Sequence, residues 1–309
     1  MKKISLGLLL SFVAVLSACQ GGEGKSGRDS KCVGGRFYDA QFGSGIIGGE
    51  AVEESSWIAR RTVFLVEKSG NVCTGSLIDR QFVLTAAHCV INSKSSNELA
   101  VVFSAQPECD DEKGTLISKV SIADRIMIHP GYRDSQAAPG DDLALVRLSL
   151  PAPGEFEAVR LMSQPFRWTE FNRVLTVGYG RTVGGKEVDS TPIALRAVVL
   201  KPLAGPALTE ALRWNPTLSD DAGQASGGGN QRRLWLNQMD GQGICNGDSG
   251  GPAFVRGNGG TYQVGVASFV SQKSKESTCR MFGVYTNVQA YRAWIEKSYR
   301  AMNGRKNLF

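Results

Sequence analysis

The hexapeptide GDSGGP at residues 247–252 has the composition expected around a serine nucleophile. The hydroxyl of a serine attacks a carbonyl group efficiently only where preorganised donors meet the oxyanion that develops. Glycines beside Ser249 let backbone N–H groups turn toward such an oxyanion, because glycine tolerates conformations that other residues avoid. A glycine-rich turn that contains a serine by chance would explain the shorter pattern G-x-S-x-G, but not the whole hexapeptide. The segment therefore predicts acyl-transfer chemistry at Ser249.

A serine nucleophile also needs a base, because its hydroxyl reacts poorly at neutral pH. The chain contains two histidines, His88 and His129. His88 follows an apolar run that predicts a strand at residues 82–85, and the adjacent Cys89 offers a disulfide that would fix the turn. His129 lies in an Ile-His-Pro sequence, where we expect a surface or loop histidine. His88 is therefore the candidate base.

Three motifs resemble, in the same order, those of the trypsin family of serine proteases, which have the chymotrypsin fold. They are LTAAHC at residues 84–89, DDLAL at residues 141–145 and GDSGGP at residues 247–252. The resemblance implies a catalytic triad of His88, Asp142 and Ser249, in which Asp142 is buried and orients His88. It makes Asp141 the exposed neighbour, and it assigns the oxyanion donors to the amides of Gly247 and Ser249.

The order of the motifs along the chain separates this interpretation from a rival fold. The pattern G-x-S-x-G also occurs in α/β-hydrolases, in which the histidine follows the serine. Here both histidines precede Ser249, and strands do not alternate with long helices. A lipase or esterase of that fold is therefore excluded. The order also supports Asp142, because an aspartate pair before a strand is by itself often only a turn.

The segment IIGG at residues 46–49 resembles the mature N-terminus that proteases of this family acquire when a propeptide is cut. The resemblance implies that the freed ammonium group of Ile46 pairs with Asp248, because a buried carboxylate requires a charged or hydrogen-bonded partner. Gly45 precedes this site in place of the family's usual Arg or Lys, which leaves the activating protease open. An ordinary apolar strand start is the alternative for this segment.

By the same resemblance, the base and walls of the primary specificity pocket are Gly243, Val270 and Gly283. Gly243 stands where trypsin-like enzymes carry an aspartate, so no fixed charge awaits a Lys or Arg side chain. We expect Val270 to narrow the entrance and Gly283 to leave depth behind it, while Ser268 lies in the strand that pairs with substrate backbone. These residues predict cleavage after Ala, Val or similar small-to-medium apolar residues, or after aromatic residues if Val270 turns aside.

From Ile46 onward, short β-branched and aromatic runs are separated by Gly, Pro, Asn and Asp, which is typical of an all-β barrel or sandwich. The expected strands are 61–67, 72–78, 82–85, 99–104, 120–128, 143–148, 174–178, 194–200, 252–255, 264–269 and 283–286. The resemblance implies one protease domain at 46–309 with two six-stranded antiparallel β-barrels, roughly 46–155 and 156–290. Apolar residues at helical spacing over 288–302 predict a closing α-helix on the second barrel. Residues 202–233 are expected to form an enlarged surface loop, with a short helix at 207–214.

The N-terminus predicts export. Lys2 and Lys3 precede an apolar run that is too short to remain as a transmembrane helix, so residues 1–19 read as a signal peptide. The run ends LSAC, which resembles the lipobox of bacterial lipoproteins and makes Cys19 the lipidated residue. An ordinary cleavage site that contains a cysteine is the alternative. Gln20 favours the outer over the inner membrane of a bacterial envelope, with release to the periplasm or the extracellular space as the other locations. Residues 20–45 read as a flexible linker and propeptide.

The chain has seven cysteines, which leaves six for disulfides if Cys19 carries lipid. An even number suits an exported protein in an oxidising compartment. Closing the short loop around His88 would stabilise the fold by about 3 kcal/mol. The predicted pairs are Cys73–Cys89 around His88, Cys245–Cys279 around Ser249, and Cys32–Cys109 by elimination.

The formal net charge of +6 is spread over scattered Lys and Arg residues, which indicates a solvated surface. We expect no nucleic-acid partner. The predicted chemistry needs no metal or organic cofactor. We expect a monomer that acts on protein or peptide substrates and reaches a membrane through the lipid on Cys19. A catalytically silent binding protein on the same fold would be expected to lack a triad residue, and all three are present. A purely structural lipoprotein would need no triad.

Overall fold

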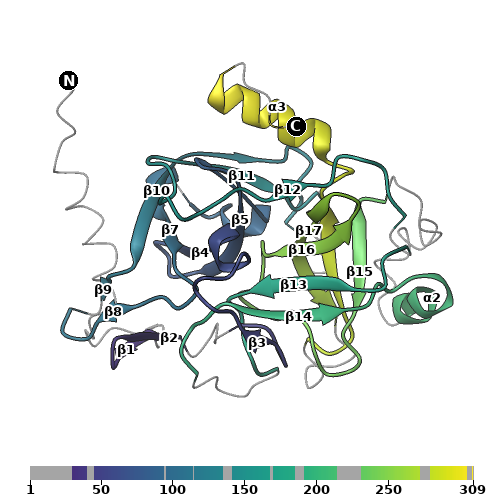
Figure 1. The fold of residues 1–309 in the computed structure, drawn as a ribbon, viewed down its shortest axis with the longest axis horizontal. Helices are drawn as coiled ribbons and strands as arrows, with labels where there is room; N and C mark the ends of the chain where they lie inside the picture. Colours follow the sequence, from purple (N-terminus) through teal and green to yellow (C-terminus); the bar gives the residue numbers. More distant parts are fainter. Residues whose placement is uncertain are drawn as a thin grey trace.

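The computed structural model describes residues 30–39, 45–93, 95–113, 115–134, 141–167, 170–184, 191–213, 231–271, 279–304 and 308. The expected signal peptide, the lipidated Cys19 and the rest of the linker lie outside these residues. Strands dominate the described chain, and they form two β units that lie side by side (Figure 1). The expected all-β fold class is therefore confirmed.

The first unit is a closed barrel of six antiparallel strands in the order β10-β11-β6-β5-β4-β7. These strands are β4 (Thr62–Glu67), β5 (Val72–Asp79), β6 (Phe82–Thr85), β7 (Leu99–Phe103), β10 (Lys119–Ile128) and β11 (Ala144–Leu148). Nearly every residue of β4, β6 and β7 is buried, because these strands are covered on both faces. The register pairs Ala144 with Thr85, so the segments after β6 and before β11 meet at one end of the barrel.

The second unit is a curved sheet with the strand order β15-β18-β17-β16-β13-β14-β3. Its strands are β3 (Glu50–Ala51), β13 (Val174–Gly178), β14 (Arg196–Leu200), β15 (Arg233–Asn237), β16 (Pro252–Gly257), β17 (Gly260–Ser271) and β18 (Phe282–Asn287), with β12 (Arg160–Leu161) parallel beside β17. An isolated bridge from Pro202, just beyond β14, to Leu236 links the β14 side of the sheet to the edge strand β15. Within the described residues, closure of the expected second barrel is limited to this bridge and its neighbouring hydrogen bonds. The sequence did not predict β15.

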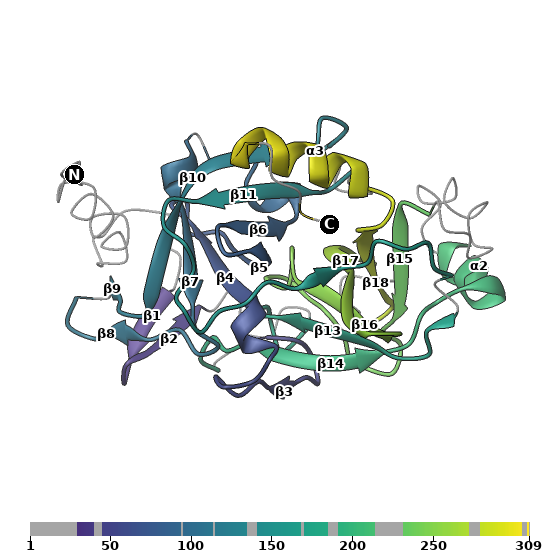
Figure 2. The same ribbon diagram turned by 45° about the horizontal axis from the view of Figure 1, so that its top comes forward.

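The C-terminal helix α3 (Arg292–Asn303) lies on the first barrel, along β11 (Figure 2). The ring of Tyr299 packs on Phe82 with centroids 4.6 Å apart, and Arg147 donates to the carbonyl of Met302 at 2.6 Å. Ile295, Tyr299 and Met302 join the hydrophobic core of that barrel. The expectation that this helix packs on the second barrel is therefore wrong, because its apolar face is buried against β6 and β11.

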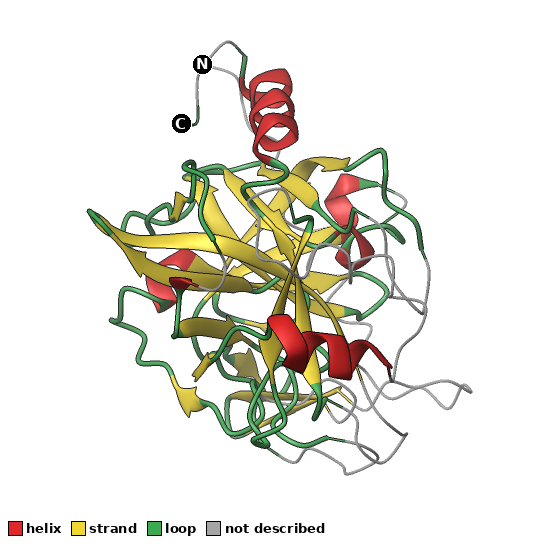
Figure 3. Cartoon of the chain, turned by 90° about the vertical axis from the view of Figure 1, so that its right-hand side faces the viewer, coloured by secondary structure: helices red, strands yellow, loops and turns green. Residues whose placement is uncertain are grey.

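The remaining helices are short and lie at the edges of the strands. Helix α2 (Gly205–Arg213) covers the outside of the second unit near β15, on the face turned toward the viewer in Figure 3. It buries Leu208, Ala211 and Leu212 in a cluster with Trp235. Among the residues that the structure describes, the 3-10 helices are η2 (Ala59–Arg61), η3 (Ala87–Cys89) and η4 (Ser96–Glu98).

Part of the segment expected to be a flexible linker forms a β-hairpin, β1 (Ser30–Val33) and β2 (Arg36–Asp39). A disulfide joins Cys32 to Cys109 in β8 (Cys109–Asp110), which pairs with β9 (Thr115–Leu116). Phe37 is buried, and its carbonyl accepts a hydrogen bond from the amide of Ile193 at 2.8 Å. The coil expectation is wrong for residues 30–39, because a covalent bond and a buried aromatic residue hold them on the domain.

Candidate active site

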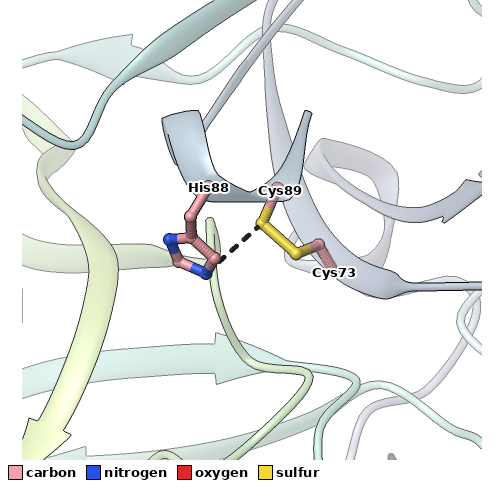
Figure 4. Close-up of side chains that lie close together, drawn as sticks. All are labelled: Cys73, His88 and Cys89. Carbon is pink, nitrogen blue, oxygen red and sulfur yellow. Dashed lines mark hydrogen bonds between the residues drawn. A yellow bond between two sulfur atoms is a disulfide. The ribbon is translucent and has the colours of Figure 1, made fainter. Parts of the chain in front are cut away.

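His88 lies on η3, directly after the buried strand β6, at one end of the first barrel. The Cys73–Cys89 disulfide ties this helix to β5, and Cys89 Sγ lies 3.9 Å from Nε2 of His88 (Figure 4). Strand pairing and the disulfide therefore both fix the segment that carries the candidate base, His88. The two sulfur atoms are bonded to each other, so they are not available as the thiolates that bind metal ions.

Asp142 precedes β11 and is buried beside His88. Its Oδ2 lies 2.8 Å from Nδ1 of His88, and its Oδ1 accepts a hydrogen bond from the backbone amide of His88 at 3.0 Å. The hydroxyl of Ser268 donates to the same Oδ2 at 2.6 Å, and Thr286 donates to the Asp142 carbonyl at 2.9 Å. Both carboxylate oxygens are thus engaged, and they orient the imidazole so that Nε2 faces away from the aspartate.

The pair has the electrostatics of a base and its orienting carboxylate. Burial lowers the pKa of His88, but the negative charge of Asp142 and its hydrogen bond to the imidazole raise that pKa by more. The net effect is a pKa above the ordinary histidine value of 6.5. Burial would raise the pKa of Asp142, but the attraction of His88 and hydrogen bonds from His88 and Ser268 hold that pKa below its ordinary value. The charged form of each group therefore stabilises the charged form of the other.

Ser268 reaches Asp142 because strand β17 has a bulge at this point. The register with β18 shifts between Ala267 and Phe269, so Ser268 is the extra residue. A bulge of this kind redirects a side chain that would otherwise follow the alternation of the strand. The sequence analysis expected Ser268 to lie in the strand that pairs with substrate backbone. It did not predict the hydrogen bond from Ser268 to Asp142.

Ser249 lies in the turn that leads into β16, next to the segment that carries His88. Gly250 packs so tightly that an added Cβ would lie 2.1 Å from the hydroxyl of Thr85 and 3.1 Å from the amide of Ala86. Within the described residues, no hydrogen bond joins the hydroxyl of Ser249 to His88. Catalytic hydrogen bonds are often long in unliganded enzymes and shorten when substrate binds.

Thr74 in β5 links the first barrel to the serine turn, and the sequence analysis missed it. Its amide donates to the carbonyl of Ser249 at 2.8 Å, and its hydroxyl donates to the carbonyl of Gly247 at 3.1 Å. The same hydroxyl accepts a hydrogen bond from the amide of Tyr179 at 3.1 Å. Thr74 is fully buried, so these bonds form away from competing water. Its position directly after Cys73 was the only signal in the sequence.

Asp248 is fully buried, and its two oxygens accept hydrogen bonds from the amides of Gly180 and Cys245, each at 2.8 Å. Burial raises the pKa of Asp248 to about 7, although these two hydrogen bonds act to lower it. A Cβ added at Gly178 would lie 2.1 Å from Oδ1 of Asp248, so this close approach requires glycine. The carboxyl group is thus enclosed by backbone.

The uncut segment around Ile46 passes close to Asp248. The amide of Gly45 donates to the carbonyl of Gly180, whose own amide bonds Asp248. Ile46 is completely buried, and Ile47 exchanges two backbone hydrogen bonds of 3.0 Å with Gly243. The expected activation site therefore lies between the turn of Asp248 and the expected base of the pocket.

The expected pocket residues come from three segments that lie together. Val270 in β17 is the cross-strand partner of Gly283 in β18. Val270 also packs against a small cluster that contains Ile47 and the Cys245–Cys279 disulfide. The side chain of Gln238, which the sequence analysis did not single out, lies in the space between Gly243 and Gly283.

His129 lies in the loop directly after β10, as one of the two expected alternatives had it, whereas Asp141 is less exposed than expected. The ring of His129 lies 5.1 Å from that of Tyr291 and 5.0 Å from that of Trp294, with its side chain only 16% exposed. Burial lowers its pKa, although the charge of Asp141 acts in the opposite direction. Asp141 accepts hydrogen bonds from Tyr291 and Arg232. Both residues therefore contact the segment where α3 begins, and both are only slightly exposed.

No helix among the described residues is long and apolar enough to cross a membrane.

Known proteins resemble this chain over most of the described domain. The sequence matches the family model described as Trypsin over residues 46–295. It is 29% identical over 237 residues to the CLIP domain-containing serine protease B15 of Anopheles gambiae, covering 72% of this chain and 60% of that protein. It is 28% identical over 263 residues to chymotrypsin-like elastase family member 1 of Bos taurus, covering 82% of this chain and 89% of that protein. The Rattus norvegicus protein of the same name is 28% identical over 258 residues, covering 81% of this chain and 88% of that protein. The chain thus spans less than two thirds of the insect relative and most of the two mammalian ones.

Proposed function

This chain belongs to the trypsin family of serine proteases, and from that premise we propose that it is a serine endopeptidase acting through His88, Asp142 and Ser249. The observation that carries the proposal is the buried Asp142 carboxylate, which holds Nδ1 of His88 at 2.8 Å beside the GDSGGP turn. An ion pair of this kind serves a base that must become a cation during the reaction.

The proposed reaction has two halves. His88 Nε2 takes the proton of the Ser249 hydroxyl as the oxygen attacks the scissile carbonyl, and it then gives that proton to the leaving amine. Water then enters, loses a proton to His88 and attacks the acyl carbon; the bond from that carbon to the Ser249 oxygen breaks, and His88 returns the proton to this oxygen, which restores both residues. Asp142 stabilises the imidazolium in both halves. The backbone amides of Gly247 and Ser249 are proposed to bind the oxyanion, and the positive φ of 93° at Gly247 is a conformation that suits glycine.

Activation is proposed to require cleavage between Gly45 and Ile46. The freed ammonium group of Ile46 would then pair with Asp248, whose buried carboxyl group otherwise has an elevated pKa. Its charged form would fix the backbone of residues 247–249 and hence the oxyanion donors. Support for this proposal comes from the buried Ile46 and from the contact of Gly45 with Gly180.

The substrate class is proposed to be peptides and proteins with a small apolar residue before the cleaved bond. Gly243 provides no charge for Lys or Arg, and Val270 narrows the entrance beside Gly283. Two mammalian relatives are named chymotrypsin-like elastases, which agrees with this preference. Cleavage is proposed to occur at the bacterial cell envelope, with the enzyme held by lipid on Cys19.

The test of the catalytic proposal is covalent labelling of Ser249 by a fluorophosphonate. Cleaved enzyme should react stoichiometrically, and Ser249→Ala should abolish the label while leaving the fold intact. The labelling rate should fall as pH drops through the pKa of His88, which lies above 6.5, because the imidazolium cannot accept the serine proton. Cleaved protein that folds but takes no label would instead be a silent member of the family.

A further inference from the structure

Gln238 is a polar residue that follows β15 and is completely buried. A Cβ added at Gly243 would lie 2.2 Å from Cδ of Gln238, and one added at Gly283 would lie 2.3 Å from its Oε1. Real Cβ atoms do not approach other atoms so closely. The glutamine side chain therefore occupies the space that side chains at both glycines would otherwise take.

Hydrogen bonds hold the amide of Gln238 in this position. Its Nε2 donates to the carbonyls of Ile244 and Cys279, at 3.0 and 2.8 Å, and its Oε1 accepts from the amide of Ile244 at 3.2 Å. Both donor hydrogens and one acceptor site are thus satisfied by buried backbone groups. Displacing the amide would leave those buried groups without partners, which is strongly unfavourable.

The amide lies on the same face of the sheet as the expected pocket. Val270 and Gly283 are cross-strand partners, so the Val270 side chain and the Cβ position of Gly283 point the same way. Ile244 also lies on this face, because its Cγ1 would be 3.0 Å from a Cβ at Gly283. The sequence predicted that the specificity pocket would extend behind Val270, because Gly283 has no side chain to fill that space. The position of Gln238 shows that this depth is filled.

We propose that Gln238 forms the floor of the primary specificity pocket and limits it to Ala and side chains of similar size. The inference rests on the proposed function, since it concerns the pocket beside Ser249. Val270 narrows the entrance and Gln238 sets the depth. Leu, Phe and Lys side chains are excluded because they would have to displace an amide that three hydrogen bonds hold in place.

The first test compares peptide substrates that differ only in the residue before the cleaved bond: Ala, Val, Leu and Phe. The wild type should prefer Ala. Gln238→Ala should raise kcat/KM for Leu and Phe relative to Ala by about tenfold or more, the usual effect of one or two added methylenes of space. Gln238→Met is the matched control, because it loses the hydrogen bonds but keeps the length of the side chain. Fluorophosphonate titration normalises each rate to the active fraction and reports separately on the proposed chemistry.

The inference would be overturned if Gln238→Met and Gln238→Ala raised kcat/KM for the Leu and Phe substrates equally, or if neither variant changed it. Val270→Gly provides a test that leaves Gln238 intact: it should improve cleavage after Val but not after Phe, and a preference for Phe in this variant would contradict the proposed floor. Equilibrium binding of indole to cleaved Ser249→Ala protein gives a readout that needs no turnover. Binding should be detectable only when Gln238→Ala is added, and binding to the protein with Gln238 present would refute the proposal.

Discussion

At the scale of single residues, burial decides how two carboxyl groups close to Ser249 behave. Asp142 has the His88 imidazole as its partner and a pKa below its ordinary value, whereas Asp248 has backbone amides as partners and a pKa raised to about 7. Hydrogen bonds from amides therefore offset the desolvation of Asp248 only in part. A carboxyl group in this state would gain a strong partner when cleavage frees the amine of Ile46.

Asp248 should make the uncut chain less stable as pH rises. Its pKa is 3.8 in the unfolded chain and about 7 in the folded one, so the folded state holds a proton that the unfolded state has lost. The contribution of Asp248 is therefore most favourable below pH 3.8 and is lost as pH rises toward 7. Urea unfolding of uncut Ser249→Ala protein between pH 4 and pH 8 measures this dependence.

Asp248→Asn is the control for that measurement, because an amide cannot titrate. The free energy of unfolding of this variant should fall less steeply between pH 4 and pH 7. Identical slopes in the two proteins would mean that Asp248 is charged in the uncut chain and already has an adequate partner there.

At the scale of elements, the site depends on contacts between the two β units. Strands β6 and β11 place His88 and Asp142 at one end of the first barrel, and the bulge in β17 brings Ser268 to the same carboxylate. Strand β5 contributes Thr74, which bonds the carbonyls of both Gly247 and Ser249. The proposed oxyanion donors are therefore fixed from the opposite unit.

Thr74→Val should lower kcat with little change in KM. Valine keeps the shape of threonine but leaves the carbonyl of Gly247 and the amide of Tyr179 without this partner. Direct loss of an oxyanion donor costs about 10²–10³-fold in kcat, and we expect about tenfold for this indirect effect. Steady-state kinetics with titrated active enzyme give both constants, and Thr74→Ser should restore most of kcat.

Thr176→Val is the matched control, because Thr176 is equally buried and its hydroxyl bonds the carbonyl of Val198 in the second unit. If this variant lost as much kcat as Thr74→Val, the effect of Thr74 would reflect general packing and not the geometry of the serine turn.

At the scale of the whole molecule, the hairpin of β1 and β2 precedes the proposed activation site in the chain but is attached to the domain that follows this site. Cys32 lies before Gly45 in the chain, and its disulfide partner Cys109 lies after it. Buried Phe37 and the hydrogen bond from Ile193 add to this attachment. A cut before Ile46 would therefore leave two chains joined by one disulfide.

Activated enzyme should migrate as a single species in denaturing gels without reductant and as two fragments after reduction. If Cys19 carries lipid, the catalytic chain should also stay with the membrane after cleavage and leave it when the disulfide is reduced. The double variant Cys32→Ser, Cys109→Ser should release the catalytic chain in denaturant without reductant. Separation of the wild-type fragments without reductant would contradict the prediction.

The sequence by itself determined the strands of the first barrel to within one residue at either end, because alternating apolar runs and turn residues are local signals. It also predicted the three cysteine pairs that the structure contains, the Cys32–Cys109 pair only by elimination, and its motifs named the candidate catalytic residues with their order. The hydrogen bonds and burial around those residues came from the structure. Local patterns of this kind depend only on neighbours along the chain.

Only the tertiary structure decided the contacts between distant segments. No local pattern in the sequence marks Gln238 as a pocket residue. Its proposed limit on the depth of the pocket arises because the strand register brings Gly283 beside it. The side of the molecule that α3 covers, the burial of His129 and the docking of the hairpin at residues 30–39 depend in the same way on which surfaces meet. Apolar periodicity predicts that a face will be buried, but not against which partner, because hydrophobic burial is non-directional.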